Sequence, residues 1–205
     1  IRASSSKRGM PFEWAFLLDA FQAERDQGIT IDTTQVWLKT AKRNYTLVDA
    51  PGHKEFLRNM VTGAAAADGA LLVVDAKEGV REQSRRHAYL LSLLGLTQIV
   101  VAVNKMDLVG YKQDVFDAIV ADFRILAQSL GFNSIIPIPL SALKGDNITG
   151  TSPNTIWYTG LSLLQHLESV EIDADADAAR PFRLPVQWVN RPNLDFRGFA
   201  GMNAA

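Results

Sequence analysis

The chain has 205 residues, of which 47% are hydrophobic and 21% charged, and its formal net charge is −1. This charge argues against a protein that binds nucleic acid or a membrane surface through a general basic field, so we expect neither as a partner. The absence of cysteine excludes disulfides and thiolate metal sites and is consistent with a cytoplasmic protein. No apolar run approaches the roughly 18 residues that a transmembrane helix needs.

The first quarter of the chain predicts one helix and a hairpin. Residues 11–27 carry apolar side chains at helical spacing, and Gly28 is expected to end that helix. Two strands follow at 33–39 and 44–49, joined by the polar tip at 40–43.

Helices and strands then alternate along the chain. We expect helices at 55–67, 82–94, 114–130 and 161–170, and strands at 69–75, 98–104 and 135–139. The apolar run at 69–75 is continuous, which predicts a strand buried on both faces. The alternation predicts an α/β fold whose mostly parallel sheet is covered by helices on both faces. Residues 1–170 are therefore assigned to one domain.

A change of composition marks the end of that domain. Residues 171–180 alternate Asp and Ala and are expected to form a solvated acidic linker. From Pro181 apolar residues alternate as in a strand, so 181–205 is interpreted as the start of a second, β-barrel domain. The chain lacks an initiator Met and a recognisable ending, and we expect it to be a fragment.

Residues 104–107 (Asn-Lys-Met-Asp) follow a predicted strand and have a clear chemical logic. One carboxylate, Asp107, can accept from both the N1–H and the exocyclic amine of guanine, whereas adenine would leave it unpaired. Asn104 can bond the base and tie neighbouring loops together, and the Lys105 stem can lie over the base plane. The alternative is a strand-end turn with a side-chain cap.

Residues 141–144 (Ser-Ala-Leu-Lys) follow the next predicted strand. The small side chains of Ser141 and Ala142 would let the backbone approach a base, and the Ala142 N–H could meet the guanine O6. Leu143 completes this candidate loop. Taken alone, the stretch is better interpreted as an ordinary strand-to-loop turn.

A third loop, at 49–53 (Asp-Ala-Pro-Gly-His), follows the strand at 44–49. Asp49 is suited to holding Mg²⁺ through water, and Gly52 lets its N–H approach a terminal phosphate. His53 could orient an attacking water, although a turn histidine near a helix start is the simpler alternative. Thr30, which lies 19 residues before Asp49, could complete the Mg²⁺ shell and act as a switch when the γ-phosphate is present.

These motifs together resemble the translational-factor class of GTPases. The resemblance rests on three stretches, at 23–32, 49–53 and 59–63. Within the class two families compete: elongation factor 1-alpha with its bacterial counterpart, and the GTPase large subunit of sulfate adenylyltransferase. Further stretches at 140–148, 157–160 and 180–199 are similar to the sulfate-activating subunit. The Asn-Arg-Pro-Asn-Leu-Asp-Phe run at 190–196 favours that subunit, because elongation factors do not carry it.

The resemblance implies a GTPase subunit that pairs with a smaller catalytic subunit. Hydrolysis of GTP, with Mg²⁺ as cofactor, would drive formation of adenosine phosphosulfate and pyrophosphate from ATP and sulfate. An elongation factor that delivers aminoacyl-tRNA remains the alternative. The fold implied is a P-loop GTPase sheet followed by the start of a β-barrel.

One motif of the class does not occur in the chain. A Gly-x-x-x-x-Gly-Lys-Ser/Thr stretch would hold the β- and γ-phosphates, and it is absent from residues 1–205. In this class its strand lies between those expected at 44–49 and 69–75. We therefore expect this chain by itself to bind nucleotide poorly and to hydrolyse it negligibly.

Overall fold

The computed structural model describes residues 30–65, 67–171, 186, 188–191 and 196–201. The chain divides into two compact units, residues 1–169 and 170–205, which are taken separately here. The helix expected at 11–27 and nearly all of the linker expected at 171–180 lie outside the described residues.

The predicted hairpin is present. Strands β1 (Thr34–Lys39) and β2 (Asn44–Asp49) pair antiparallel, with Lys39 opposite Asn44. In the turn, the Thr40 hydroxyl oxygen accepts hydrogen bonds from the backbone N–H groups of Lys42 and Arg43, each at 3.2 Å. This side-chain cap explains why the polar tip reverses the chain there.

The second sheet is parallel, as predicted. Its strands are β3 (Ala70–Asp75), β4 (Gln98–Asn104) and β5 (Ser134–Pro139), in the order β3-β4-β5. Asp75 lies opposite Asn104, so the carboxyl ends of two neighbouring strands meet at one edge of the sheet. Ligands of open parallel sheets bind at that edge.

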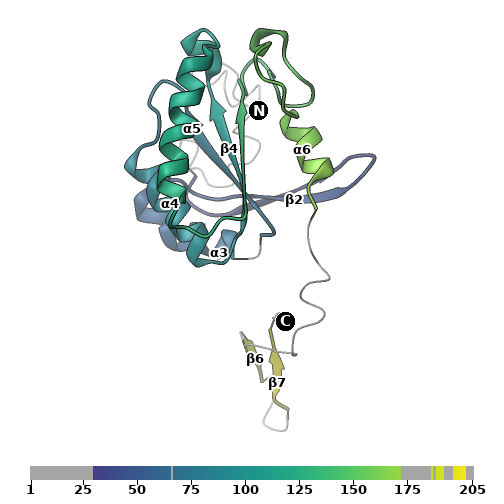
Figure 1. Cartoon of the computed structure of the whole chain (residues 1–205). Helices are drawn as coiled ribbons and strands as arrows, with labels where there is room; N and C mark the ends of the chain where they lie inside the picture. Colours follow the sequence, from purple (N-terminus) through teal and green to yellow (C-terminus); the bar gives the residue numbers. More distant parts are fainter. Residues whose placement is uncertain (1–29, 66, 172–185, 187, 192–195, 202–205) are drawn as a thin grey trace, which may run out of the picture. The chain divides into compact units, whose positions relative to one another are not determined.

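Helices cover both faces of this sheet. They are η2 (Lys54–Phe56), α3 (Leu57–Ala64), α4 (Glu82–Leu93), η3 (Met106–Val109), α5 (Gln113–Ala127), η4 (Pro153–Thr155) and α6 (Leu163–Ser169). In Figure 1, α3, α4 and α5 lie on one side of β4, and α6 lies on the other. The helix expected at 55–67 thus divides into a 3-10 turn and a shorter α-helix.

Strand β4 is buried on both faces. Ile99, Val101 and Val103 join the main core, and Val100 and Ala102 join a smaller core against which α6 packs. Its unbroken run of apolar residues fits this position in the middle of the sheet.

Strand β3 differs from the prediction. Leu72 and Val74 are buried, but Leu71 is 46% exposed and Val73 is 56% exposed. On this face α6 covers neighbouring positions of β4 and β5, and no described element packs over Leu71 and Val73. The prediction that β3 is buried on both faces is therefore wrong. An apolar run does not specify how far the layer that covers the sheet extends.

In the second unit, β6 (Trp188–Asn190) and β7 (Gly198–Ala200) pair antiparallel, with Val189 opposite Phe199. The interpretation of 181–205 as the start of a β-barrel domain stays a prediction.

Candidate functional site

Asn104, the last residue of β4, ties together two of the predicted loops. Its Oδ1 atom accepts a hydrogen bond of 2.7 Å from the Lys105 N–H and one of 3.0 Å from the Ala142 N–H. The N–H of Met106 also donates to the carbonyl of Leu140 at 3.2 Å. The motifs at 104–107 and 141–144 therefore lie side by side at the carboxyl ends of β4 and β5.

Asp107 and Ser141 form the second link between these loops. The Ser141 hydroxyl donates to Asp107 Oδ1 at 2.7 Å, and Ser141 is fully buried. Asp107 itself is half-buried. One carboxylate oxygen is thus held by a protein donor, and the carboxylate is fixed in place before any base arrives.

Lys105 adopts a left-handed backbone conformation, with a φ of 64°, and its side chain points back to β3. Its Nζ atom lies 2.6 Å from Asp75 Oδ2. The hydrogen bond to Lys105 lowers the pKa of the Asp75 carboxyl, and the same bond raises the pKa of Lys105. This ion pair anchors the long side chain that was expected to cover the base.

Gly52, in the third predicted loop, is held from α4. Gln83 Nε2 donates to the Gly52 carbonyl at 2.6 Å and lies 2.9 Å from His87 Nε2. Burial is the main cause that lowers the pKa of His87, and the nearby Arg86 charge adds to it. A neutral ring nitrogen can then accept from Gln83, so the pair fixes the backbone of Gly52.

His53 caps the short helix η2. Its Nδ1 atom accepts a hydrogen bond of 3.4 Å from the Glu55 N–H, and its ring lies 5.9 Å from that of Phe56. The side chain is 43% exposed. This geometry matches the turn-histidine alternative and leaves the role of His53 toward a water molecule as a prediction.

Thr30 is the first described residue, and the segment that follows it is tied to α3. The side-chain amide of Asn59 donates to the Ile31 carbonyl at 2.9 Å. Asp49 ends β2 opposite Thr34 in β1. The candidate Mg²⁺ residues Thr30 and Asp49 thus belong to two neighbouring segments of the hairpin region.

Leu143 differs from its neighbours in the second loop because its side chain is 86% exposed. No group of three or more His, Cys, Asp or Glu residues forms a metal cluster within the described ranges. A Mg²⁺ ion held by one carboxylate, a hydroxyl and phosphate oxygens would not form such a cluster. No helix in the described part of the chain is long and apolar enough to cross a membrane.

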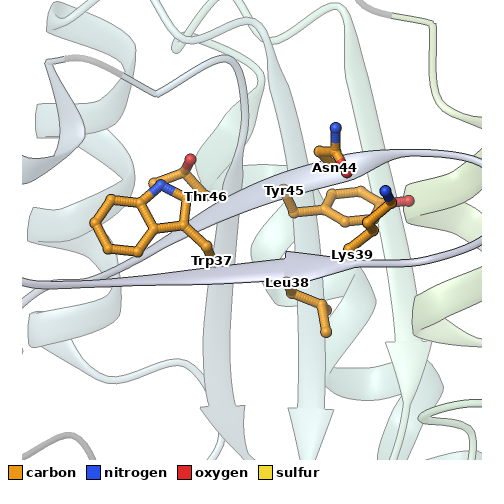
Figure 2. Close-up of a pocket in the computed structure, with 6 residues that line it drawn as sticks. All are labelled: Trp37, Leu38, Lys39, Asn44, Tyr45 and Thr46. Atoms are coloured by element: carbon orange, nitrogen blue, oxygen red, sulfur yellow. The ribbon is translucent and has the colours of Figure 1, made fainter.

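A hollow on the hairpin lies away from these loops. It is lined by Trp37, Leu38, Lys39, Asn44, Tyr45 and Thr46, which Figure 2 shows on the two strands. It contains none of the predicted site residues, and we assign it no role in nucleotide binding.

The match to a family model decides which class of protein this is. The model described as the elongation factor Tu GTP binding domain matches residues 2–172. The chain belongs to the elongation factor Tu GTP binding domain family. The family name gives GTP as the nucleotide, which agrees with the predicted guanine-reading loops.

Several relatives of this GTP binding domain are about half identical to it. "Bifunctional enzyme NodQ" of Rhizobium meliloti (strain 1021) is 51% identical over 98% of this chain and 31% of its own length. "Bifunctional enzyme CysN/CysC" of Xylella fastidiosa is 52% identical, over 97% of this chain and 32% of its own. "Sulfate adenylyltransferase subunit 1" of Aeromonas salmonicida is 51% identical, over 96% of this chain and 42% of its own length. The chain thus spans between 31% and 42% of the length of these relatives.

Solved structures confirm the fold of the GTP binding domain. A bacterial selenocysteine-specific elongation factor, EF-Sec, superimposes with a TM-score of 0.62 at 21% identity, over 91% of this chain and 30% of that one. Sup35 complexed with GDP gives a TM-score of 0.56 at 24% identity, over 76% of this chain and 39% of that one.

Sequence reasoning missed three residues that hold this site. Asp75 ends a strand next to that of Asn104, and this position could have singled it out. Gln83 and His87 are four residues apart on one helix face. The His87 ring is half-buried on that face.

Proposed function

We propose that this domain reads the guanine base of GTP with Asp107, Asn104 and Lys105 from one loop and with Ser141, Ala142 and Leu143 from the next. The observation that carries the proposal is the pair of links between the loops, from Ser141 to Asp107 and from Ala142 to Asn104. They bring the Asp107 carboxylate, an acceptor, and the Ala142 N–H, a donor, to the same strand edge. The Ala142 N–H now donates to Asn104 Oδ1, and guanine O6 would share or replace that acceptor.

We propose that the segments around residues 30 and 49–53 contact the phosphates of the nucleotide and the Mg²⁺ ion. Asp49 and Thr30 offer a carboxylate and a hydroxyl, which are hard oxygen ligands of the kind Mg²⁺ takes, and the ion would neutralise phosphate charge when bound. Gly52 would donate its N–H to the terminal phosphate, and His53 would orient the attacking water. Because Gln83 holds the Gly52 carbonyl, the peptide between Gly52 and His53, next to the one that carries this N–H, is already restricted.

We further propose that the domain serves a GTPase subunit of sulfate adenylyltransferase, coupling GTP hydrolysis to formation of adenosine 5'-phosphosulfate from ATP and sulfate. A smaller catalytic subunit would be the protein partner. Support comes from relatives at about 50% identity whose names include sulfate adenylyltransferase subunit 1. An elongation factor 1-alpha-like role has less support: the family model carries an elongation-factor name, but these relatives at about 50% identity are not named as elongation factors, and the similar solved structures are below 25% identity.

The base reading is tested by changing one atom of the carboxylate. In Asp107→Asn, the side-chain NH₂ would face the exocyclic amine of guanine, and two donors cannot pair. Xanthine has a carbonyl in place of that amine, so the Asn side chain can donate to it. NMR titration of the Ala142 amide with GDP, XDP and ADP detects affinities down to about the millimolar range. We expect the native chain to prefer GDP and the variant to prefer XDP. Equal response of the native chain to GDP and ADP would overturn the proposal.

The biological role is tested by reconstitution. The chain is immobilised and offered, in parallel, a catalytic small subunit of sulfate adenylyltransferase and a mixture of tRNA and ribosomes. We expect capture of the small subunit alone. Capture of tRNA or ribosomes in place of the subunit would establish the elongation-factor alternative.

A further inference from the structure

A group of polar residues lies behind the two base-reading loops and is called the clamp here: Tyr111, Asp146, Asn147, Ser152 and Thr155. Its centre is the carboxylate of Asp146. Oδ2 accepts from the Tyr111 hydroxyl at 2.6 Å, and Oδ1 accepts from the Ser152 hydroxyl at 2.6 Å and from the Asn154 amide at 3.1 Å. Charged acceptors of this kind form the stronger hydrogen bonds in proteins.

Asn147 anchors the clamp to the sheet. It is 1% exposed, and its amide donates to the Pro139 carbonyl at 2.7 Å and to Thr155 Oγ1 at 2.8 Å. Its Oδ1 accepts from the Ser152 N–H at 2.7 Å. Pro139 ends β5, directly before the second loop. The buried amide is fully paired, as a buried polar group must be to avoid a large cost.

The clamp joins the far ends of the two loops. Tyr111 follows Asp107 by four positions, and its N–H donates to the Met106 carbonyl at 2.9 Å. Asp146 is bridged to Ser141 through backbone bonds of 3.1 and 3.3 Å. The Asp146 carboxylate therefore closes a ring whose opposite side is the bond from Ser141 to Asp107.

Backbone strain gathers at the same place. Within the described residues, the non-glycine residues with a left-handed φ are Lys105, Tyr111 and Asn147, at 64°, 54° and 55°. Each of these conformations is less favourable than an ordinary one for a residue with a side chain. All three belong to the base-reading loops or the clamp. Such strain persists only where surrounding contacts impose it, and it is typical of functional sites.

We propose that Asp146 and Tyr111 are positioning residues that hold the two loops at the spacing needed to select guanine, before a nucleotide binds. The inference rests on the proposed guanine-reading role of these loops. Neither residue needs to touch the nucleotide, since they act through Ser141 and Asp107. Loss of the clamp would leave the loops free to separate, and selectivity for the base would fall before phosphate contacts change.

The electrostatics agree with the geometry. The hydrogen bond to Asp146 raises the pKa of Tyr111 to about 12. Burial works to raise the pKa of Asp146, but the hydrogen bonds from Ser152, Tyr111 and Asn154 together hold it below its usual value. The carboxylate is thus charged and paired in neutral solution, and the Tyr111 proton stays in place between the loops.

Two pairs of variants test the proposal. Tyr111→Phe removes only the hydroxyl, and Tyr89→Phe makes the same change at an exposed tyrosine on α4. Asp146→Asn removes the charge, and Asp117→Asn makes the same change on the exposed side of α5. Tyr111→Phe is mild enough to fold if the Asp146 variant does not.

The first readout needs no nucleotide. Hydrogen exchange of the Ala142 amide, which donates to Asn104, reports whether the loops stay together. We expect exchange about tenfold faster in Tyr111→Phe and Asp146→Asn, and no change in either control. Ultraviolet titration should also show that the pKa of Tyr111 falls from about 12 toward about 10 in Asp146→Asn. Unchanged exchange in both clamp variants would overturn the proposal.

The second readout is selectivity. The ratio of GDP to ADP affinity, measured by NMR titration, is expected to fall about tenfold in Tyr111→Phe while its melting temperature stays close to that of Tyr89→Phe. A fall in melting temperature with the ratio intact would show a structural role and overturn the proposal. Faster Ala142 exchange in a chain that does not discriminate GDP from ADP would overturn the proposed function and leave the clamp standing.

Discussion

The hydroxyl of Ser141 donates a hydrogen bond of 2.7 Å to Asp107 Oδ1, across 34 positions of sequence. The bond joins the carboxyl-end loops of two adjacent parallel strands, β4 and β5. Because Ser141 is fully buried, water cannot replace its hydrogen bond easily. The carboxylate that we propose to read the base therefore owes its position to a residue from a different loop.

Replacing Ser141 by Ala should weaken the binding of guanine nucleotide and lower stability by about 1–3 kcal/mol, because its hydroxyl also accepts from the Lys144 N–H. The change leaves Asp107 Oδ1 without its donor, and we expect about tenfold weaker GDP binding. NMR titration measures the affinity, and thermal unfolding measures stability. Ser84→Ala in α4, for which no hydrogen bond is present among the described contacts, is the control. Equal GDP affinity in both variants would contradict this role of Ser141.

Acidification should destabilise the domain through His87. Burial lowers the pKa of His87 in the folded chain, so the unfolded chain binds more protons below about pH 6.5. Stability is then greatest above about pH 6.5 and falls as the pH drops toward the folded pKa. Protonation would also turn the His87 Nε2 atom from acceptor to donor and break its contact with Gln83, which holds Gly52.

The measurement is the free energy of unfolding at about pH 7.5 and about pH 5.5. His87→Gln should lose part of the decrease seen in the native chain. His166→Gln serves as a comparison, since burial lowers the pKa of His166 as well and should give a separate contribution. If the free energy of unfolding of His87→Gln falls between the two pH values as much as that of the native chain, His87 is not the group responsible.

The ion pair between Asp75 and Lys105 should contribute modestly to stability and only above acidic pH. The pKa of Asp75 is lowered in the folded state, so its contribution is present above about pH 4 and disappears as the pH falls through the folded pKa. The Asp75 side chain is 23% exposed, and we expect Asp75→Asn to cost about 0.5–1 kcal/mol at neutral pH.

Denaturant unfolding at about pH 7 and about pH 3 measures this contribution, with Asp117→Asn as a control for the same chemical change on an exposed carboxylate. The difference between the Asp75 variant and the native chain should shrink at the lower pH. An equal difference at both values would mean that Asp75 acts through packing and not through its charge.

The parallel sheet and the meeting of the two loops at its carboxyl edge could be predicted from the sequence because each depends on local order, while their base-reading role stays a proposal. Apolar runs such as that of β4 specify strands, and a polar residue at the end of a strand specifies the site. The clamp could not be predicted in the same way. Tyr111 and Asp146 are 35 positions apart, and they meet because the segments that follow β4 and β5 fold against each other.

The phosphate side shows a second limit. The motif at 49–53 predicted that Gly52 would matter, and it gave no sign that Gln83 holds its carbonyl from 31 positions away. Residues that support a loop from a neighbouring helix carry no motif of their own. Which residue of α4 reaches the loop depends on how the helix is rotated about its axis, and the sequence pattern of α4 specifies that rotation only in part.

Strand β3 offers a direct test of how far its covering layer extends. Val73 and Val74 are adjacent, yet Val73 is 56% exposed and Val74 is 1% exposed. We expect Val74→Ala to cost about 2 kcal/mol through lost packing in the main core. Val73→Ala should cost about 0.5 kcal/mol or less, since little of its surface is buried. Denaturant unfolding of the two single variants compares identical changes on opposite faces of one strand. A cost at Val73 that matches the cost at Val74 would show that this face of β3 is covered in solution, and that the strand is buried on both sides as its apolar run predicts.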